Sequence, residues 1–352
     1  MAYHLGETYI QLTAKAKARN LFKFAANHSF NAEIQEKAAF RYAKLSLEEG
    51  YQKTAKAKLQ TFIQEYPQSA YIDEAQNLLG GLLLNTKNYQ QALEIIEEVP
   101  DMNAKMQEAY QQIAYQRGLE LYQDKAYADA REVFIKALDY PQKPRFKALS
   151  YFWLGEAYYH LDSYNKASRA YQNFLFQDIA SSTKYYTLAS YNIGYSHFKT
   201  KAYQKATASF EDYRKRQTGK PSNERYTDAL VRLADCYFAQ SSYDQALKYY
   251  NQTIERGHKS VPYALFQKGI ILGLKGQKDE KIKQLRKLTQ THKESSYVDD
   301  ALFEIGNVYF VRGEYQMAYN QFRYLTQDYQ NCSYYRLAFL KMGLVRYNQN
   351  KT

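Results

Sequence analysis

Cysteine is almost absent from this chain, which has 2 cysteines among 352 residues. A fold held together by several disulfides is therefore excluded. Long apolar runs are absent too, and with a mean hydropathy of −0.68 no segment has the character of a membrane-spanning helix. The first residues, Met1 to Leu5, lack the basic and apolar regions of a secretory signal. Tyrosine is the residue in excess, with 38 copies, so the aromatic pattern has to be explained.

A glycine or alanine recurs in the same local context along the whole chain, at intervals of 35 to 40 residues. This first column consists of Gly6, Ala43, Gly80, Gly118, Gly155, Gly194, Ala234, Gly269, Gly306 and Gly343. A second column, twelve residues later, consists of Ala18, Ala55, Ala92, Ala130, Ala167, Ala206, Ala246, Lys281 and Ala318. Two small-residue columns locked together at such a period indicate a solenoid of repeated supersecondary units.

The fifth repeat shows that each unit is a pair of helices. Its residues fall into two groups with spacings of three and four, which places each group on one helical face. The groups are Tyr151, Leu154, Gly155 and Tyr158, followed by Ala167, Tyr171 and Phe174. A turn that begins at His160 separates them, so the unit is predicted to be helix, turn, helix.

The glycines of the first column need a physical reason, because a glycine inside a helix costs about 1 kcal/mol relative to alanine. We interpret the column as the room that lets the second helix of each pair approach the first. A further column of tyrosines lies three residues before the alanine of its own repeat, at Tyr89, Tyr127, Tyr164, Tyr203, Tyr243 and Tyr315. Each of these rings is predicted to cover the turn while its hydroxyl stays in solvent.

This layout resembles the tetratricopeptide repeat (TPR) family, whose pattern of Leu-Gly-x-x-Tyr, Ala and Phe is matched by Leu154, Gly155, Tyr158, Ala167 and Phe174. The resemblance covers essentially the whole chain. It implies an all-α, right-handed superhelical solenoid of antiparallel helix pairs.

The period exceeds the usual TPR length of about 34 residues, and the segment 62–75 leading to Gly80 is similar to one TPR subgroup. That subgroup contains the TPR lipoprotein of the outer-membrane barrel-assembly machinery and a periplasmic coordinator of envelope division. The resemblance implies a bacterial protein of the periplasm or outer membrane. A cytoplasmic location is the alternative.

We expect one domain over residues 1–352. The expected repeats are 1–33, 34–70, 71–108, 109–145, 146–184, 185–222, 223–259, 260–296 and 297–333, with the first helix of a tenth at 334–352. Neither end shows the polar capping element of a solenoid, so we expect a fragment of a longer protein, whose missing flanks could attach it to a membrane. Cys236 and Cys332 lie in repeats too distant for a disulfide and are expected to be ordinary buried or semi-buried thiols.

No catalytic or metal-binding constellation emerges from the sequence. The six histidines fall in separate repeats or turns, without a paired ligand at metal spacing. His197 stands where other repeats have tyrosine and is interpreted as a core aromatic. We therefore expect a protein that is not an enzyme and has no cofactor, metal or small-molecule substrate.

The first helices of a TPR array line its concave groove, so two positions of these helices are candidates for partner binding. Together they predict a groove formed by Tyr115, Tyr122, Phe152, Tyr159, Tyr191, Phe198, Phe238, Phe266, Phe303 and Phe310. Exposed aromatic rows usually mark an interaction surface. The alternative is that these rings are packed between helices.

The net charge of +12 is uneven, because residues 201–300 carry most of the excess. In the eighth repeat Lys281 replaces the small alanine, and a basic patch surrounds it. The patch consists of Lys275, Lys278, Lys281, Lys283, Arg286 and Lys287. It is either a docking point for an acidic surface or an irregularity in which the second helix is displaced and the Lys281 stem extends to solvent.

The sequence thus predicts a non-catalytic scaffold that binds a peptide or protein partner through the TPR groove, within a bacterial envelope complex. Two alternatives stay open: a nucleic-acid-binding solenoid, and an adaptor or regulatory domain of a larger enzyme. The charge favours nucleic acid, but the basic residues form no regular stripe alternating with the aromatics, which argues against it.

Overall fold

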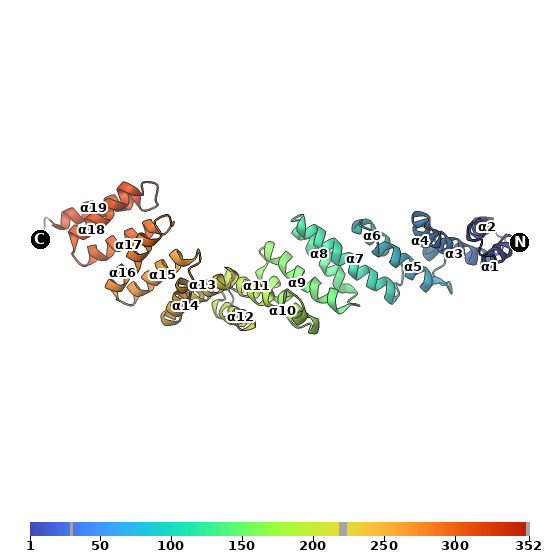
Figure 1. Ribbon diagram of the computed structural model, residues 1–352, viewed down its shortest axis with the longest axis horizontal. Coiled ribbons are helices and arrows are strands. Elements are labelled where there is room, and N and C mark those ends of the chain that lie inside the picture. The colour runs from blue at the N-terminus through green and yellow to red at the C-terminus, as the bar shows by residue number, and fades with distance from the viewer. Residues whose placement is uncertain (29–30, 218–223, 350–352) are drawn as a thin grey trace. The chain divides into compact units, whose positions relative to one another are not determined.

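The computed structural model describes residues 1–28, 31–217 and 224–349, and within these the chain is helical, with no strand (Figure 1). The first ten helices are α1 (Ala2–Gln11), α2 (Lys15–His28), α3 (Ala32–Glu48), α4 (Gln52–Glu65), α5 (Ile72–Leu84), α6 (Tyr89–Glu97), α7 (Ala104–Gln123), α8 (Tyr127–Asp139), α9 (Pro144–His160) and α10 (Tyr164–Leu175). A short 3-10 helix, η1 (Asp178–Ser182), follows. The remaining helices are α11 (Tyr186–Lys199), α12 (Tyr203–Arg216), α13 (Glu224–Ala239), α14 (Tyr243–Arg256), α15 (Val261–Leu274), α16 (Lys278–Thr291), α17 (Val298–Val311), α18 (Tyr315–Asp328) and α19 (Tyr335–Gln349).

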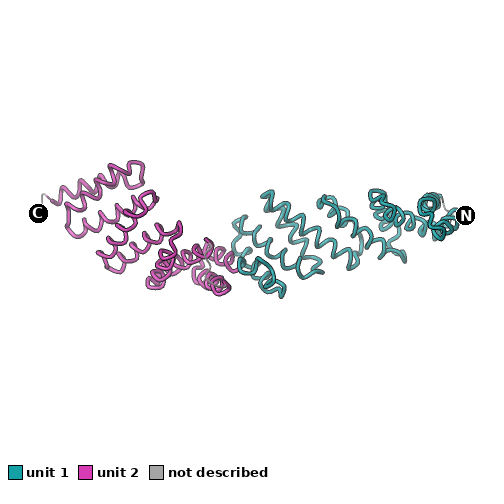
Figure 2. Tube along the Cα trace, in the orientation of Figure 1, with its two compact units in different colours: residues 1–189 teal, residues 190–352 magenta. Residues whose placement is uncertain are grey.

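The chain divides into two compact units, residues 1–189 (unit 1) and 190–352 (unit 2) (Figure 2). The boundary falls inside α11. In unit 1 the helices from α1 to α10 follow one another as pairs, and in unit 2 the pairs α13–α14, α15–α16 and α17–α18 are followed by α19. The predicted all-α array of antiparallel helix pairs is confirmed. The single domain and its repeat boundaries stay predictions.

The turn inside most helix pairs has one residue in the left-handed region, seven positions after the first-column residue. Eight turns share this geometry, at Thr13, Gly50, Lys125, Asp162, Lys201, Ser241, Gly276 and Gly313. Glycine is found at three of them, and only there is the left-handed backbone free of a side-chain penalty. The shared conformation explains why the turns keep one length.

The first column has the role that the sequence suggested. A Cβ placed on Gly155 would lie 2.6 Å from Cε1 of Tyr171, and one on Gly118 would lie 2.5 Å from Cε1 of Phe134. In both cases the ring belongs to the second helix of the same pair, sixteen residues later. That position is fully or almost fully buried in every repeat, at Phe22, Leu59, Ile96, Phe134, Tyr171, Phe210, Tyr250, Leu285 and Phe322. The glycine therefore makes room for a large side chain of the partner helix, which holds the pair together.

Candidate partner-binding surfaces

One row of the predicted groove lies largely in the core. Tyr115, Phe152 and Phe303 are only 6%, 1% and 5% exposed. Phe152 packs on Tyr171 with ring centroids 5.7 Å apart, and Phe303 packs on Phe322 at 5.6 Å. These three rings are therefore packed between helices, which is the alternative interpretation of this row.

The other members of the same row are less enclosed. Tyr191 and Phe266 are half-buried. Phe266 stacks on Tyr297 with the centroids 5.8 Å apart, whereas Tyr191 lies beside Tyr195 at 4.9 Å. Both keep part of their surface in contact with solvent.

The second row of the predicted groove is half-buried throughout, at Tyr122, Tyr159, Phe198, Phe238 and Phe310. Each of these rings packs against the turn tyrosine five residues later. The centroid distances are 5.3 Å for Tyr122–Tyr127, 5.3 Å for Tyr159–Tyr164, 5.9 Å for Phe198–Tyr203, 6.0 Å for Phe238–Tyr243 and 6.0 Å for Phe310–Tyr315. The tyrosine column thus covers the turn as predicted, and each ring of this row retains one accessible side.

Arginines join these aromatics in one part of unit 2. The guanidinium of Arg232 lies 6.0 Å from the ring centroid of Tyr195 and 5.5 Å from that of Phe198. The exposed Arg225 lies 5.7 Å from the ring of Tyr191. We call these five residues the aromatic–arginine surface; its side chains come from α11 and α13.

Two carboxylates hold this surface in place. The Tyr191 hydroxyl donates a hydrogen bond of 2.7 Å to Oδ2 of Asp228, to which Tyr195 also donates. The Arg232 guanidinium donates to Asp235 at 2.7 Å. Asp235 also accepts hydrogen bonds of 2.7 and 2.9 Å from the hydroxyls of Tyr250 and Tyr263. The rings and the guanidinium are therefore fixed before any partner arrives.

The protonation states agree with this network. Burial, followed by the neighbouring Tyr195 and the Asp228 carboxylate, raises the pKa of Tyr191 above its ordinary value. Burial also raises the pKa of the Asp235 carboxyl, while Arg232 and the tyrosine hydroxyls act in the opposite direction. The tyrosines consequently remain hydrogen-bond donors at neutral pH.

The basic patch proves to be partly neutralised. Lys275 pairs with Asp244, and Lys281 Nζ lies 2.5 Å from Glu304. Arg286 donates a hydrogen bond of 2.6 Å to the Tyr309 hydroxyl. The Lys283 amine lies 3.7 Å from Glu280, and Lys278 and Lys287 are exposed. Docking of an acidic surface at this patch stays a prediction.

The eighth repeat nevertheless retains the common helix packing. A Cβ on Gly269 would lie 2.7 Å from Leu285, as in the other repeats. A Cβ on Gly273 would lie 2.8 Å from Cδ of Lys281, so the lysine stem occupies the space that a large side chain takes elsewhere. The α16 helix is therefore not displaced, and Lys281 replaces the missing ring.

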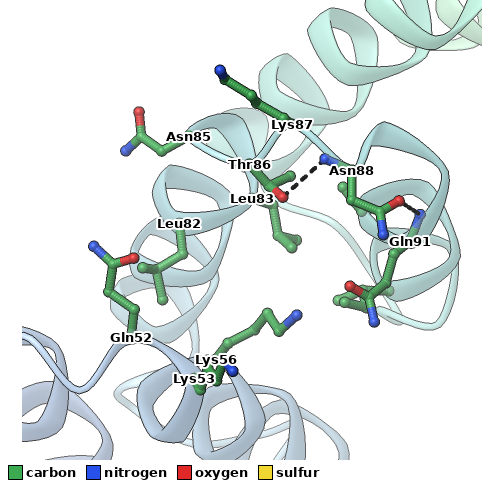
Figure 3. A pocket seen from close by; sticks show the side chains of 12 residues that line it. Gln52, Lys53, Lys56, Leu82, Leu83, Asn85, Thr86, Lys87, Asn88 and Gln91 are labelled. Atoms are coloured by element: carbon green, nitrogen blue, oxygen red, sulfur yellow. Dashed lines mark hydrogen bonds between the residues drawn. The ribbon is translucent and has the colours of Figure 1, made fainter.

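A hollow in unit 1 was not anticipated from the sequence. Figure 3 shows 12 residues that line it, from the start of α4, the end of α5 and the start of α6. They are Gln52, Lys53, Lys56, Leu82, Leu83, Asn85, Thr86, Lys87, Asn88, Gln91, Ala92 and Ile95. No sequence pattern points to this hollow, because its residues come from two repeats and meet only when those repeats stack.

Family models identify the repeats. Models described as tetratricopeptide repeat match residues 191–262 and residues 37–69. The chain therefore contains tetratricopeptide repeats. The first match spans the helices that carry the aromatic–arginine surface, and the subgroup suggested by the longer period stays a prediction.

The solved structures that resemble this chain share low sequence identity with it. MamA shares 20% identity, with 50% of this chain and 95% of that chain covered and a TM-score of 0.43. YrrB, titled a TPR protein with an unusual peptide-binding site, shares 20%, with 59% and 97% covered and a TM-score of 0.44. PilW, titled a widely conserved type IV pilus biogenesis factor, shares 17%, with 65% and 98% covered and a TM-score of 0.45. None of the curated proteins matches this TPR chain.

The described residues of this TPR protein contain no group of three histidine, cysteine or acidic side chains placed to hold a metal. None of the described helices is both long and apolar enough to cross a membrane. Cys236 is buried and Cys332 half-buried, as predicted for ordinary thiols, and burial raises the pKa of Cys236 to about 12. His197 is half-buried, and burial lowers its pKa. The absence of catalysis stays a prediction.

Proposed function

We propose that this TPR protein is a non-catalytic scaffold that binds a peptide or protein partner through the aromatic–arginine surface of unit 2. The observation that carries the proposal is the placement of Arg232 over both Tyr195 and Phe198, with centroid distances of 6.0 and 5.5 Å. Aromatic and arginine side chains supply most of the energy at protein interfaces. Their close grouping supports this part of the repeat array as the contact site.

The fixed geometry of the surface supports binding by a second argument. Ordering a rotamer-rich side chain on binding costs about 0.5–1.5 kcal/mol. Arg232 is already tied to Asp235, and Tyr191 and Tyr195 are tied to Asp228. A partner that meets these groups therefore loses less free energy to ordering than it would on a mobile surface.

The proposal places this scaffold in a bacterial envelope complex, periplasmic or associated with the outer membrane. Its support is the similarity of the segment 62–75 and of the long repeat period to the envelope subgroup of TPR proteins.

The test is affinity capture from a lysate of the source cells with the unmodified chain and with a variant that combines Phe198→Ala and Arg225→Ala. Phe198 is half-buried and Arg225 exposed, so the helices should retain their packing. We expect the partners captured by the unmodified chain to be lost or reduced by more than about tenfold with the variant, since interface anchors of this kind contribute about 2 kcal/mol each.

Phe310→Ala provides the matched control. Phe310 has the same repeat position as Phe198 and packs on its own turn tyrosine at 6.0 Å, but it lies in the ninth repeat. Capture that is unchanged in the Phe198/Arg225 variant, or equally weakened by Phe310→Ala, contradicts the proposal.

A further inference from the structure

All the charged residues that line the hollow in unit 1 are lysines. Lys53 and Lys56 come from α4, and Lys87 lies in the turn before α6. The residues that line it include no aspartate or glutamate. Within the described part of the chain, none of these three lysines forms an ion pair, so their positive charge is not neutralised by the protein.

Other lysines of unit 1 are arranged differently. Lys15 lies 2.6 Å from Glu48, Lys44 lies 2.6 Å from Glu74, and Lys136 lies 2.6 Å from Glu97. Each of these pairs joins neighbouring repeats. Lys53, Lys56 and Lys87 have no such partner among the described residues, and Lys56 is half-buried without a counter-charge.

Two helix starts add to the positive potential. Residues of the first turn of α4 and of α6 line the hollow, and neither first turn contains an acidic residue. The N-cap of α4, Tyr51, makes no side-chain hydrogen bond to the helix. A helix N-terminus carries partial positive charge, at which a lysine such as Lys53 is unfavourable and an anion favourable. Asn88 caps α6 through its side chain, whereas no side chain of the lining offsets the positive potential at the start of α4.

The remaining lining suits a polypeptide rather than a bare ion. Leu82, Leu83 and Ile95 supply an apolar part, and Gln52 and Asn85 offer side-chain amides at the rim. Figure 3 shows Lys53 and Lys56 on the α4 side, with Asn88 and Gln91 across from them. Amides of this kind can bond the N–H and C=O groups of an extended chain, while the apolar part accepts an aliphatic side chain.

We infer that this hollow binds an acidic peptide segment, whose carboxylates pair with Lys53 and Lys56 and whose aliphatic side chain lies against Leu82 and Leu83. It is a second site, in a different unit from the aromatic–arginine surface, and its existence does not depend on that surface. A scaffold with both sites holds its partner at two places, or holds two partners.

The test measures binding of a short fluorescein-labelled peptide of alternating glutamate and leucine to the full chain by fluorescence anisotropy. The variant combines Lys53→Glu and Lys56→Glu. We expect it to raise the dissociation constant about tenfold or more, because two attractive contacts become repulsive. Added salt should weaken binding to the unmodified chain, since exposed charges are screened.

Lys58→Glu is the matched control, because Lys58 is exposed on the same helix but does not line the hollow. It should bind the peptide as the unmodified chain does. The variant combining Phe198→Ala and Arg225→Ala should also bind normally, which separates this site from the proposed function. Circular dichroism of every variant confirms that the helices are retained.

Three outcomes would overturn the inference. The first is equal binding by the Lys53/Lys56 variant and the unmodified chain. The second is equal binding of a peptide with glutamine in place of glutamate. The third is displacement of the labelled peptide by inorganic phosphate or by a single-stranded DNA oligonucleotide at lower concentrations than by unlabelled peptide, because the hollow would then select phosphate rather than an acidic peptide.

Discussion

At the scale of single residues, the fold depends on pairs in which one member is small and the other large. The side chain sixteen residues after a first-column glycine fills the space above it, as Tyr171 does for Gly155 and Phe322 for Gly306. Gly81 differs, because nothing lies within 4 Å of a Cβ placed on it. Six glycines of the column are thus required by packing, namely Gly6, Gly118, Gly155, Gly194, Gly269 and Gly306, whereas Gly81 only weakens its helix.

This difference predicts opposite effects of the same substitution. Gly155→Ala should lower the free energy of unfolding by about 1–3 kcal/mol, because its Cβ would lie 2.6 Å from a buried ring and overpacking outweighs the gain in helix propensity. Gly81→Ala should raise it by about 0.5–1 kcal/mol. Urea unfolding followed by circular dichroism measures both. Equal stability of the two variants would disprove the packing role of the column.

At the scale of helix pairs, the eighth repeat fills the space between its two helices with a different side chain from the other repeats. Its turn lacks both rings found in other repeats, with Gly273 and Lys278 at their positions. The Lys281 stem fills the space beside Gly273, and its amine reaches Glu304 on α17. Repeat two has the opposite combination, Leu47 with Ala55. The large side chain is therefore on the first helix, α3, in repeat two and on the second helix, α16, in repeat eight.

A double-mutant cycle tests this exchange. Lys281→Ala leaves a void beside Gly273, and Gly273→Leu forces a side chain into the lysine stem, so each should destabilise the chain. The double variant recreates the Leu47–Ala55 arrangement and should regain stability, with a coupling energy of about 1–3 kcal/mol. Thermal and urea unfolding of the four proteins give the coupling. Additive effects would contradict the exchange, and Glu304→Gln measures the share of the ion pair.

The helix pairs also show what the sequence can and cannot predict. The period of the small residues specifies the pairs, because six of the column glycines face the side chain sixteen residues later on the partner helix. The exposure of Phe152 could not be read in this way, since it depends on a ring stacked from the following repeat, Tyr185 at 4.4 Å. The hollow was missed for a related reason. Lys53 and Lys87 come from different repeats, and only stacking brings them together.

At the scale of the whole molecule, the buried tyrosines make the free energy of unfolding fall as the pH becomes alkaline. Burial raises the pKa of Tyr115 to about 12. It also raises the pKa values of Tyr110 and Tyr122, where the carboxylates of Glu97 and Glu156 act in the same direction. In unit 2, burial likewise raises the pKa values of Tyr191 and Tyr250. Both units therefore contain phenols that ionise more easily when unfolded.

The sign of the effect follows from these raised values. A group whose pKa is higher in the folded chain contributes its full stability below the unfolded value, near pH 10, and loses it as the pH rises toward 12 and beyond. We expect exposed tyrosines to ionise near pH 10 with the helices intact, and the others to ionise together with loss of helix at higher pH.

Phenolate absorbance and far-ultraviolet circular dichroism recorded on one pH series measure both events, and the chain in guanidinium chloride supplies the unfolded reference. Lysines also lose their protons in this range, but phenolate absorbance reports tyrosine alone. If all 38 tyrosines ionised as one class near pH 10 while the helices persisted, the buried hydroxyls would not be contributing to the fold. The double transition, by contrast, would show that the tyrosine excess is structural in both units rather than reserved for a binding surface.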